Sequence, residues 1–141
     1  MFLFAKILAI FCIFKYNIRC ISNSDRTKGE VGEMACNVLL SLMKLDIGGA
    51  ETHVVELAKE LKKRGYNVVV TSNGGVYERE LNDAGIKHYM VPLQNKNPRN
   101  VYKAWNLLKK IIQVEKIDLV HSHARIPSFI LGKLQKKLHF P

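Results

Sequence analysis

The sequence predicts an α/β fold in which a parallel sheet is covered by helices on both faces. From residue 34 onward, short apolar stretches alternate with stretches of helical period, and the connections between them are short. Strands and helices that alternate in this way form parallel sheets with right-handed crossovers. The strands are expected at residues 36–42, 67–72, 86–91 and 117–122, and each stretch is rich in apolar residues.

The first strand leads into Asp46-Ile47-Gly48-Gly49-Ala50, the stretch on which the functional prediction rests. Gly48 and Gly49 permit a sharp turn and a close approach of the backbone to a ligand. A helix is expected over residues 50–64, because apolar residues recur there every three or four positions and Gly65 follows. The first amides of a helix have no partner within it and carry the positive end of its dipole. This corner therefore suits a phosphate group, with an ordinary glycine turn as the alternative interpretation.

Three further helices are expected at residues 77–84, 100–115 and 126–138. The helical period assigns a buried face to the second of them and an inward face to the last. These faces consist of Val101, Ala104, Trp105, Leu108, Ile111 and Ile112, and of Phe129, Ile130, Leu134 and Leu138.

Two common nucleotide-binding motifs are absent. The chain has no G-x-G-x-x-G fingerprint and no glycine-rich loop that ends in Gly-Lys-Ser/Thr. A standard NAD-binding domain and a P-loop nucleoside triphosphatase are therefore disfavoured.

Three segments are expected at the carboxyl ends of the strands, where parallel sheets bind their ligands. They are residues 47–49, residues 73–75 and residues 121–125. Two glycine turns, two histidines and one arginine thus converge on one edge.

His121 and His123 are two positions apart in a strand and so point to the same side of the sheet. They are candidates to donate a hydrogen bond to a sugar or phosphate oxygen, and a structural role is the alternative. Two histidines do not make a zinc site and no third ligand is placed by spacing, so no metal is predicted. Arg125 can pair with a phosphate or lie in solvent. His53 and His88 are expected to be surface or packing residues.

The net charge of +10 is divided unevenly along the chain. Residues 1–33 carry +2 and the remainder carries +8. This balance favours an anionic partner, namely a nucleic acid, a phosphorylated sugar or an anionic membrane surface, and solubility alone is the alternative.

Residues 1–33 are expected to lie outside the fold, which would then occupy residues 34–141. The uncharged runs of the first 21 residues are too short for a membrane-spanning helix, and a weak anchor or poor signal sequence is the alternative interpretation. Residues 22–33 have the composition of a linker. Met34 is a hypothetical native start. The three cysteines are odd in number and form no C-x-x-C motif, which favours the reducing cytoplasm, with Cys36 as a small buried hydrophobe.

Taken together, the motifs resemble the N-terminal domain of a family-4 glycosyltransferase, which has a Rossmann-like sheet and forms one half of a GT-B fold. The similarity covers residues 36–141 and excludes the N-terminal stretch. The matching segments are Leu45–Glu51, Leu57–Leu61 with Arg64-Gly65, Gly85-Ile86, Pro92-Leu93 and Ile117–His123.

The resemblance implies a retaining, hexosyltransferase-type enzyme of polysaccharide biosynthesis. Its substrates would be a nucleotide-diphosphate-sugar donor and a glycan or lipid-linked acceptor, with no cofactor and no bound metal. By position, Gly48 and Gly49 would present backbone N–H groups to the diphosphate, with Arg125 as a further binding residue. His123 would approach the transferred sugar as the catalytic candidate, and His121 is the second candidate.

The sequence also departs from the family pattern. The second domain, with most donor contacts and a Glu-x7-Glu motif, is missing, and residues 34–141 are expected to be an incomplete first domain. A crevice needs both walls to orient substrates and exclude water, so the chain alone is expected to be inactive. The missing C-terminal domain is therefore an expected partner, within one chain or as half of a split enzyme.

A non-catalytic basic module that binds nucleic acid or an anionic membrane is the alternative function. Nucleic acid is not expected as a partner, because the aromatic residues fall at core spacings and no reading helix is apparent. The expected location is the cytoplasm, with peripheral binding at the inner face of the membrane as an extension of that expectation.

Overall fold

The computed structural model describes residues 36–94 and 97–138, all of which belong to the second of the two units of the chain, Ala35–Pro141. The expectations for residues 1–33 fall outside the described residues. The elements are β1 (Asn37–Ser41), α2 (Gly49–Lys63), β2 (Asn67–Ser72), α3 (Glu78–Asp83), β3 (Lys87–Met90), α4 (Pro98–Val114), β4 (Leu119–Ser122) and α5 (Arg125–Leu138). Each of these predicted strands and helices is present, and its ends lie within two residues of the predicted ends.

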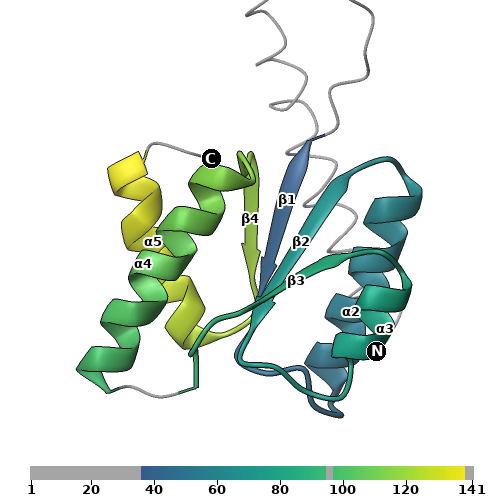
Figure 1. Ribbon diagram of the computed structural model, residues 1–141, viewed down its shortest axis with the longest axis horizontal. Helices are drawn as coiled ribbons and strands as arrows, with labels where there is room; N and C mark the ends of the chain where they lie inside the picture. The colour runs from purple at the N-terminus through teal and green to yellow at the C-terminus, as the bar shows by residue number, and fades with distance from the viewer. Residues whose placement is uncertain (1–35, 95–96, 139–141) are drawn as a thin grey trace, which may run out of the picture. The chain divides into compact units, whose positions relative to one another are not determined.

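The four strands form one parallel sheet in the order β3-β2-β1-β4. The chain moves outward from β1 to β2 and β3, and then returns to the opposite side of β1 to add β4 (Figure 1). The strand order therefore reverses between β1 and β4. In parallel sheets this reversal opens a binding position outside the carboxyl ends of the two strands.

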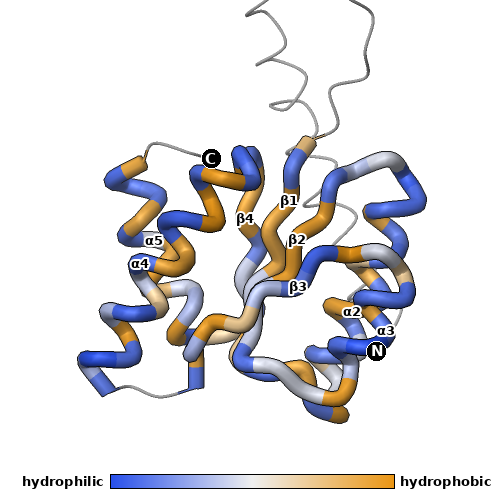
Figure 2. Tube along the Cα trace, viewed as in Figure 1, coloured by the Kyte–Doolittle hydropathy of each residue, from blue (hydrophilic) through white to orange (hydrophobic). Residues whose placement is uncertain are grey.

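Helices cover both faces of the sheet, as the sequence predicts. Helices α2 and α3 lie on one side of the strands, and α4 and α5 lie on the other (Figure 1). The strands β1, β2 and β4 are largely apolar along the trace, whereas the helices alternate between apolar and polar residues (Figure 2). This contrast follows from burial, because a sheet covered on both faces has no solvent-facing side.

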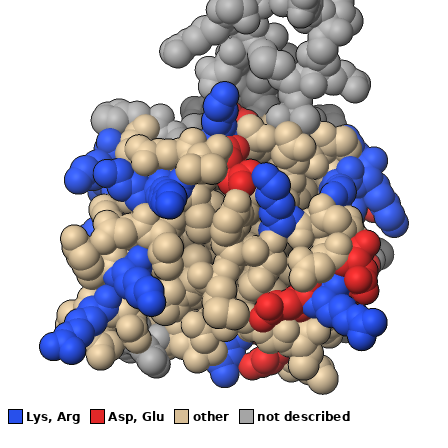
Figure 3. Space-filling view, viewed as in Figure 1, with Lys and Arg blue, Asp and Glu red and all other residues tan. Residues whose placement is uncertain are grey.

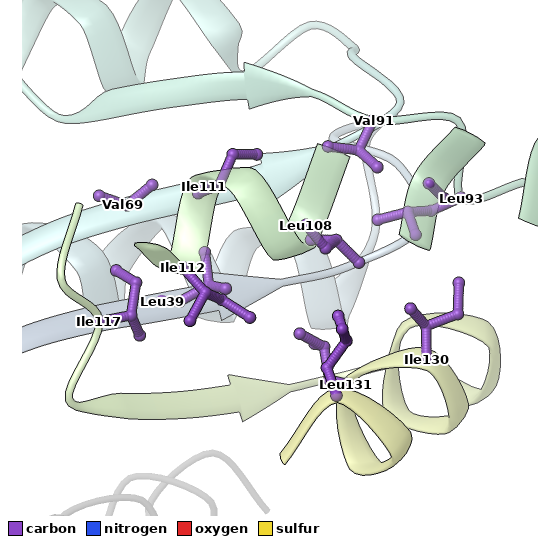
Figure 4. Close-up of a cluster of buried hydrophobic side chains, with 12 residues drawn as sticks. Leu39, Val69, Val91, Leu93, Leu108, Ile111, Ile112, Ile117, Ile130 and Leu131 are labelled. Carbon is purple, nitrogen blue, oxygen red and sulfur yellow. The ribbon is translucent and has the colours of Figure 1, made fainter. Parts of the chain in front are cut away.

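The main core cluster lies between the sheet and the α4–α5 layer (Figure 4). Leu39 of β1 and Val69 of β2 face Leu108 and Ile112 of α4 and Ile130 of α5 in this cluster. Trp105 is partly buried and packs against the cluster, which confirms its predicted core role. The core thus fixes both helices of this layer against the central strands.

The predicted inward position of Phe129 is wrong. Its side chain is 61% exposed, and Leu131 is buried in the α5 interface instead. The buried positions of α5 follow the helical spacing Pro127, Ile130, Leu131 and Leu134, and Phe129 falls on the opposite face. There the ring carries the Lys133 ammonium 4.4 Å from its centroid, an arrangement that favours an exposed aromatic ring.

Cys36 lies just before β1 and is buried. This burial confirms the predicted role of Cys36 as a small buried hydrophobe.

Candidate functional site

The loops that follow β1 and β2 are joined into one unit by their backbones. The Asn73 amide donates to the Met43 carbonyl, and the Leu45 amide donates to the Gly74 carbonyl, each at 2.9 Å. The Tyr77 amide then donates to the Leu45 carbonyl at 3.2 Å. These bonds continue the pairing of the two strands beyond their ends, so the first glycine corner has a fixed support.

Gly75 makes this close packing of the two loops feasible. Its φ is +149°, and a Cβ placed on it would lie 2.4 Å from the carbonyl carbon and oxygen of Leu45. Only glycine fits such a position without a shift of the backbone. The Gly75 amide is in turn held by the Glu78 carboxylate at 2.8 Å.

His88 of β3 also supports the loop that follows β2. Its Nε2 lies 2.8 Å from the Ser72 hydroxyl, which accepts a hydrogen bond from the Gly74 amide. Burial lowers the pKa of His88, and the nearby Glu78 carboxylate opposes that shift. His88 is therefore a packing residue, as predicted.

The start of α2 is open and has no side-chain cap. Gly48 is the N-cap residue, and its carbonyl accepts a hydrogen bond from the Thr52 hydroxyl at 2.8 Å. The Thr52 hydroxyl also lies 3.0 Å from the Tyr77 hydroxyl, which ties the first turn of α2 to the neighbouring loop. A Cβ placed on Gly49 would meet no atom within 4 Å. The backbone of the corner is thus both fixed in place and accessible.

The Glu51 carboxylate already lies against this corner. A Cβ placed on Gly48 would be 2.3 Å from Oε2 of Glu51. A negative group near the first turn of a helix is stabilised by the free amides and the dipole. The Glu51 carboxylate therefore lies at the start of α2, and a phosphate bound there would displace it.

His121 and His123 lie at the carboxyl end of β4. His121 is paired with Leu40 of β1 in the sheet, and the His123 amide donates to the Ser41 carbonyl at 2.9 Å. The rings of His121 and His123 are 4.3 Å apart between centroids. The ring of His53 lies 5.9 Å from that of His123, in an edge-to-face arrangement. Because His53 belongs to the first turns of α2, this contact brings β4 and the start of α2 together.

His53 is the residue that the sequence reasoning missed. It was assigned to the surface or to packing, although it follows Gly49 by four positions. Residues four apart on a helix lie on the same side, so the spacing from the glycine corner was a usable signal.

Burial lowers the pKa values of both β4 histidines. The pKa of His123 is lowered to about 4, mainly by burial and in smaller part by the neighbouring His121 and His53. The pKa of His121 is lowered by burial and by His53 in the same way. A neutral imidazole carries one donor and one acceptor nitrogen. Within the described residues, the buried Nε2 of His123 has no hydrogen-bond partner.

The described residues contain no group of three histidine, cysteine, aspartate or glutamate side chains arranged to hold a metal ion.

Arg125 is the first residue of α5 and follows the carboxyl end of β4. Its side chain is exposed and forms no ion pair with any residue in the described part of the chain. The structure thus links α2 to the end of β4 through His53, four residues after Gly49, and places Arg125 at the start of α5 after the same strand. The functional roles assigned to these residues remain predictions.

Comparison with protein families yields one match. A sequence model described as Glycosyltransferase Family 4 matches residues 47–141. The matched segment contains the glycine corner, all three clustered histidines and Arg125. No curated protein sequence matches the chain.

Several solved structures share the fold. A glycosyltransferase from Rickettsia africae is 26% identical with a TM-score of 0.63, over 74% of this chain and 27% of its own length. MurG of Acinetobacter baumannii is 21% identical with a TM-score of 0.60, over 75% of this chain and 33% of its own. The C-terminal domain of a Pyrococcus furiosus hydrogenase, at 15% identity and a TM-score of 0.59, has a similar fold over 82% of this chain and 93% of that domain. The chain therefore spans about a third or less of the Rickettsia glycosyltransferase and of MurG.

Proposed function

Because the chain belongs to Glycosyltransferase Family 4, we propose that it forms the acceptor-side wall of a retaining glycosyltransferase. The enzyme would move a sugar from a nucleotide-diphosphate-sugar to a glycan or lipid-linked acceptor. One observation supports this proposal above the others: His53, four residues after Gly49 on α2, contacts His123 at the end of β4, where the strand order reverses. We also propose the cytoplasm as the location.

The start of α2 suits the diphosphate of the donor. When the bond between the anomeric carbon and the diphosphate breaks, its electron pair leaves with the diphosphate, whose negative charge increases. Free amides at Gly48 and Gly49 and the positive end of the α2 dipole would stabilise that charge. The exposed Arg125 guanidinium is the nearest candidate for a second contact.

His123 suits the transferred sugar. Because its ring is neutral, it would bind a sugar hydroxyl by a hydrogen bond, and it would not neutralise the diphosphate. Nε2 has no partner among the described residues but is buried, so the ring would turn to present it to this hydroxyl. His121 and His53 would fix the plane of the ring through their contacts with it.

The acceptor oxygen would form the new bond to the anomeric carbon, and its proton would pass to the departing diphosphate. This chain would form one wall of the active site, since it spans 27% of the Rickettsia structure and 33% of MurG. A second domain facing the edge would provide the other side and exclude water.

The proposal predicts that a negative charge placed at Gly49 weakens donor binding. In Gly49→Asp the added Cβ meets no atom within 4 Å, so the fold should be retained while the carboxylate repels a diphosphate. Ligand-observed NMR with a panel of nucleoside-diphosphate sugars should show binding to the unmodified chain and a loss of about tenfold in affinity in the variant.

Gly132→Asp is the matched control, because Gly132 also has no atom within 4 Å and lies on α5, away from the corner. It should bind the nucleotide sugars as the unmodified chain does. An equal loss in both variants, or no binding of any nucleotide sugar, would refute the proposed donor site.

A further inference from the structure

His88 is a buried histidine that is connected to the glycine loop after β2. Its side chain is only 5% exposed, although it lies on β3, an outer strand of the sheet. Its Nε2 lies 2.8 Å from the Ser72 hydroxyl, whose oxygen accepts the Gly74 amide at 3.0 Å. A titratable ring is thus two hydrogen bonds away from the backbone of a glycine loop.

The hydrogen bonds between these groups fit a neutral ring. Ser72 is fully buried, and its hydroxyl has one hydrogen to donate. When Nε2 accepts that hydrogen, the Ser72 oxygen can accept the Gly74 amide, and Nδ1 carries the proton of the ring on the side of Glu78. In a protonated ring Nε2 is also a donor, so the Ser72 hydrogen loses its acceptor in a buried place.

The surroundings of His88 disfavour the charged form of its ring. Burial lowers the pKa of His88, and the Glu78 carboxylate, with Oε2 3.9 Å from Nδ1, opposes that shift in smaller part. Lys87, the preceding residue of the strand, is paired with Glu115 at 2.8 Å. Helices α4 and α5 contain no acidic residue, and charges of both signs mix over α2 and α3 (Figure 3). Glu78 is therefore the charged group that acts on the ring most directly.

Glu78 connects the ring to the same loop a second time. Its Oε1 accepts the Gly75 amide at 2.8 Å, while its Oε2 faces His88. A charged ring attracts this carboxylate more strongly than a neutral ring does, and so competes for it with the Gly75 amide. Because the Gly74 carbonyl accepts the Leu45 amide at 2.9 Å, a displaced loop also releases the loop after β1.

We propose that His88 is a pH-sensitive switch, which holds the loop after β2 closed when its ring is neutral and opens the loop when its ring is protonated. The closed loop binds fewer protons than the open loop, because the pKa of His88 is lowered only while the ring is buried. The stability of the closed loop is therefore present above the ordinary histidine pKa of 6.5 and is lost as the pH falls below it. The switch is independent of the transfer reaction, and in acid it would loosen the support of the glycine corner.

Hydrogen exchange of single backbone amides, measured by NMR, tests the proposal without a ligand. Protection factors are corrected for the intrinsic effect of pH on exchange. Between about pH 7.5 and about pH 5.5 they should fall by about three- to tenfold at the Leu45, Gly74 and Gly75 amides. Tenfold is roughly the limit when the ring binds its proton only in the open loop.

His88→Gln removes the titration and keeps a polar side chain that can donate and accept, so its loop amides should stay protected at the lower pH. His123→Gln is the matched control, because it removes another buried histidine with a lowered pKa, and it should show the same fall at the loop as the unmodified chain.

Glu78→Gln leaves the ring in place and keeps the test informative even if His88→Gln folds poorly. It removes the charge that favours the protonated ring in the closed loop, so the fall in protection should become deeper. No fall in the unmodified chain, an equal fall in His88→Gln, or a shallower fall in Glu78→Gln would overturn the proposal.

Discussion

At the scale of single residues, His123 constrains the chemistry of the site most strongly. Its ring is buried, its Nε2 is unpartnered among the described residues, and its pKa is lowered to about 4. The group is therefore a hydrogen-bonding residue at neutral pH. A mechanism that needs a histidine cation beside the diphosphate is disfavoured by this environment.

The lowered pKa also makes stability depend on pH. Histidine has an ordinary pKa of 6.5, so between about pH 6.5 and about pH 4 the unfolded chain binds more protons than the folded chain. The free energy of unfolding should therefore fall as the pH drops through this window, by on the order of 1–3 kcal/mol for His123. Urea unfolding at about pH 7.5 and about pH 5 measures the difference.

His123→Gln should show a smaller fall in the free energy of unfolding than the unmodified chain. His53→Gln is the comparison, because it removes a neighbouring ring and leaves His123 to titrate. If the fall with pH is the same in His123→Gln as in the unmodified chain, His123 is not the group responsible.

Residue-level prediction from the sequence succeeded where a residue follows a strand end and failed where it depends on a contact between elements. His121 and His123 follow directly from their place at the end of β4. His53 is brought to them only by the packing of α2 beside β4, which the sequence does not display. Its spacing from Gly49 was the one local signal.

At the scale of elements, substitution by alanine should destabilise the protein much more in the loop after β2 than in the loop after β1. Gly75→Ala places a Cβ 2.4 Å from the Leu45 backbone at a positive φ, so it should lower the free energy of unfolding by about 2–4 kcal/mol. Gly49→Ala adds a Cβ that meets nothing at the start of a helix and should change it by less than about 1 kcal/mol. Thermal and urea unfolding of both variants provide the measurement.

Equal stability of the two alanine variants would show that the loops after β1 and β2 are not packed as described. A large loss of stability in Gly49→Ala alone would contradict the account, because it would show a close contact at Gly49 and none at Gly75.

The boundaries of the elements were predictable because apolar period, glycine and proline mark them locally. The orientation of α5 was harder, since it has apolar residues at more positions than one buried face can hold. Ile130 and Leu134 were assigned correctly, and Phe129 was not. The choice between Phe129 and Leu131 depends on the shape of the α4 surface that packs against them, and that shape is a tertiary property.

At the scale of the whole molecule, the alternation of strands and helices predicted the parallel sheet, and the structure confirms it. The predicted resemblance to the family-4 glycosyltransferases is also confirmed, by the family match over residues 47–141. The fold alone would not identify the family, because a hydrogenase domain shares it at 15% identity. Within the described residues, no helix is long and apolar enough to cross a membrane.

The charge asymmetry between the two helical layers was visible in the sequence only as a total. The structure shows where the net charge of +8 of residues 34–141 lies, because it places α4 and α5 on one face of the sheet.

The most direct test of the central claim is an amide NMR titration of the intact chain with inorganic pyrophosphate. If the start of α2 binds the diphosphate beside the histidine cluster, the largest shift changes should appear at the amides of Gly48, Gly49 and Ala50 and in the ring of His123. If millimolar pyrophosphate leaves these signals unchanged, or moves only those of α4 and α5, the account of the site is contradicted.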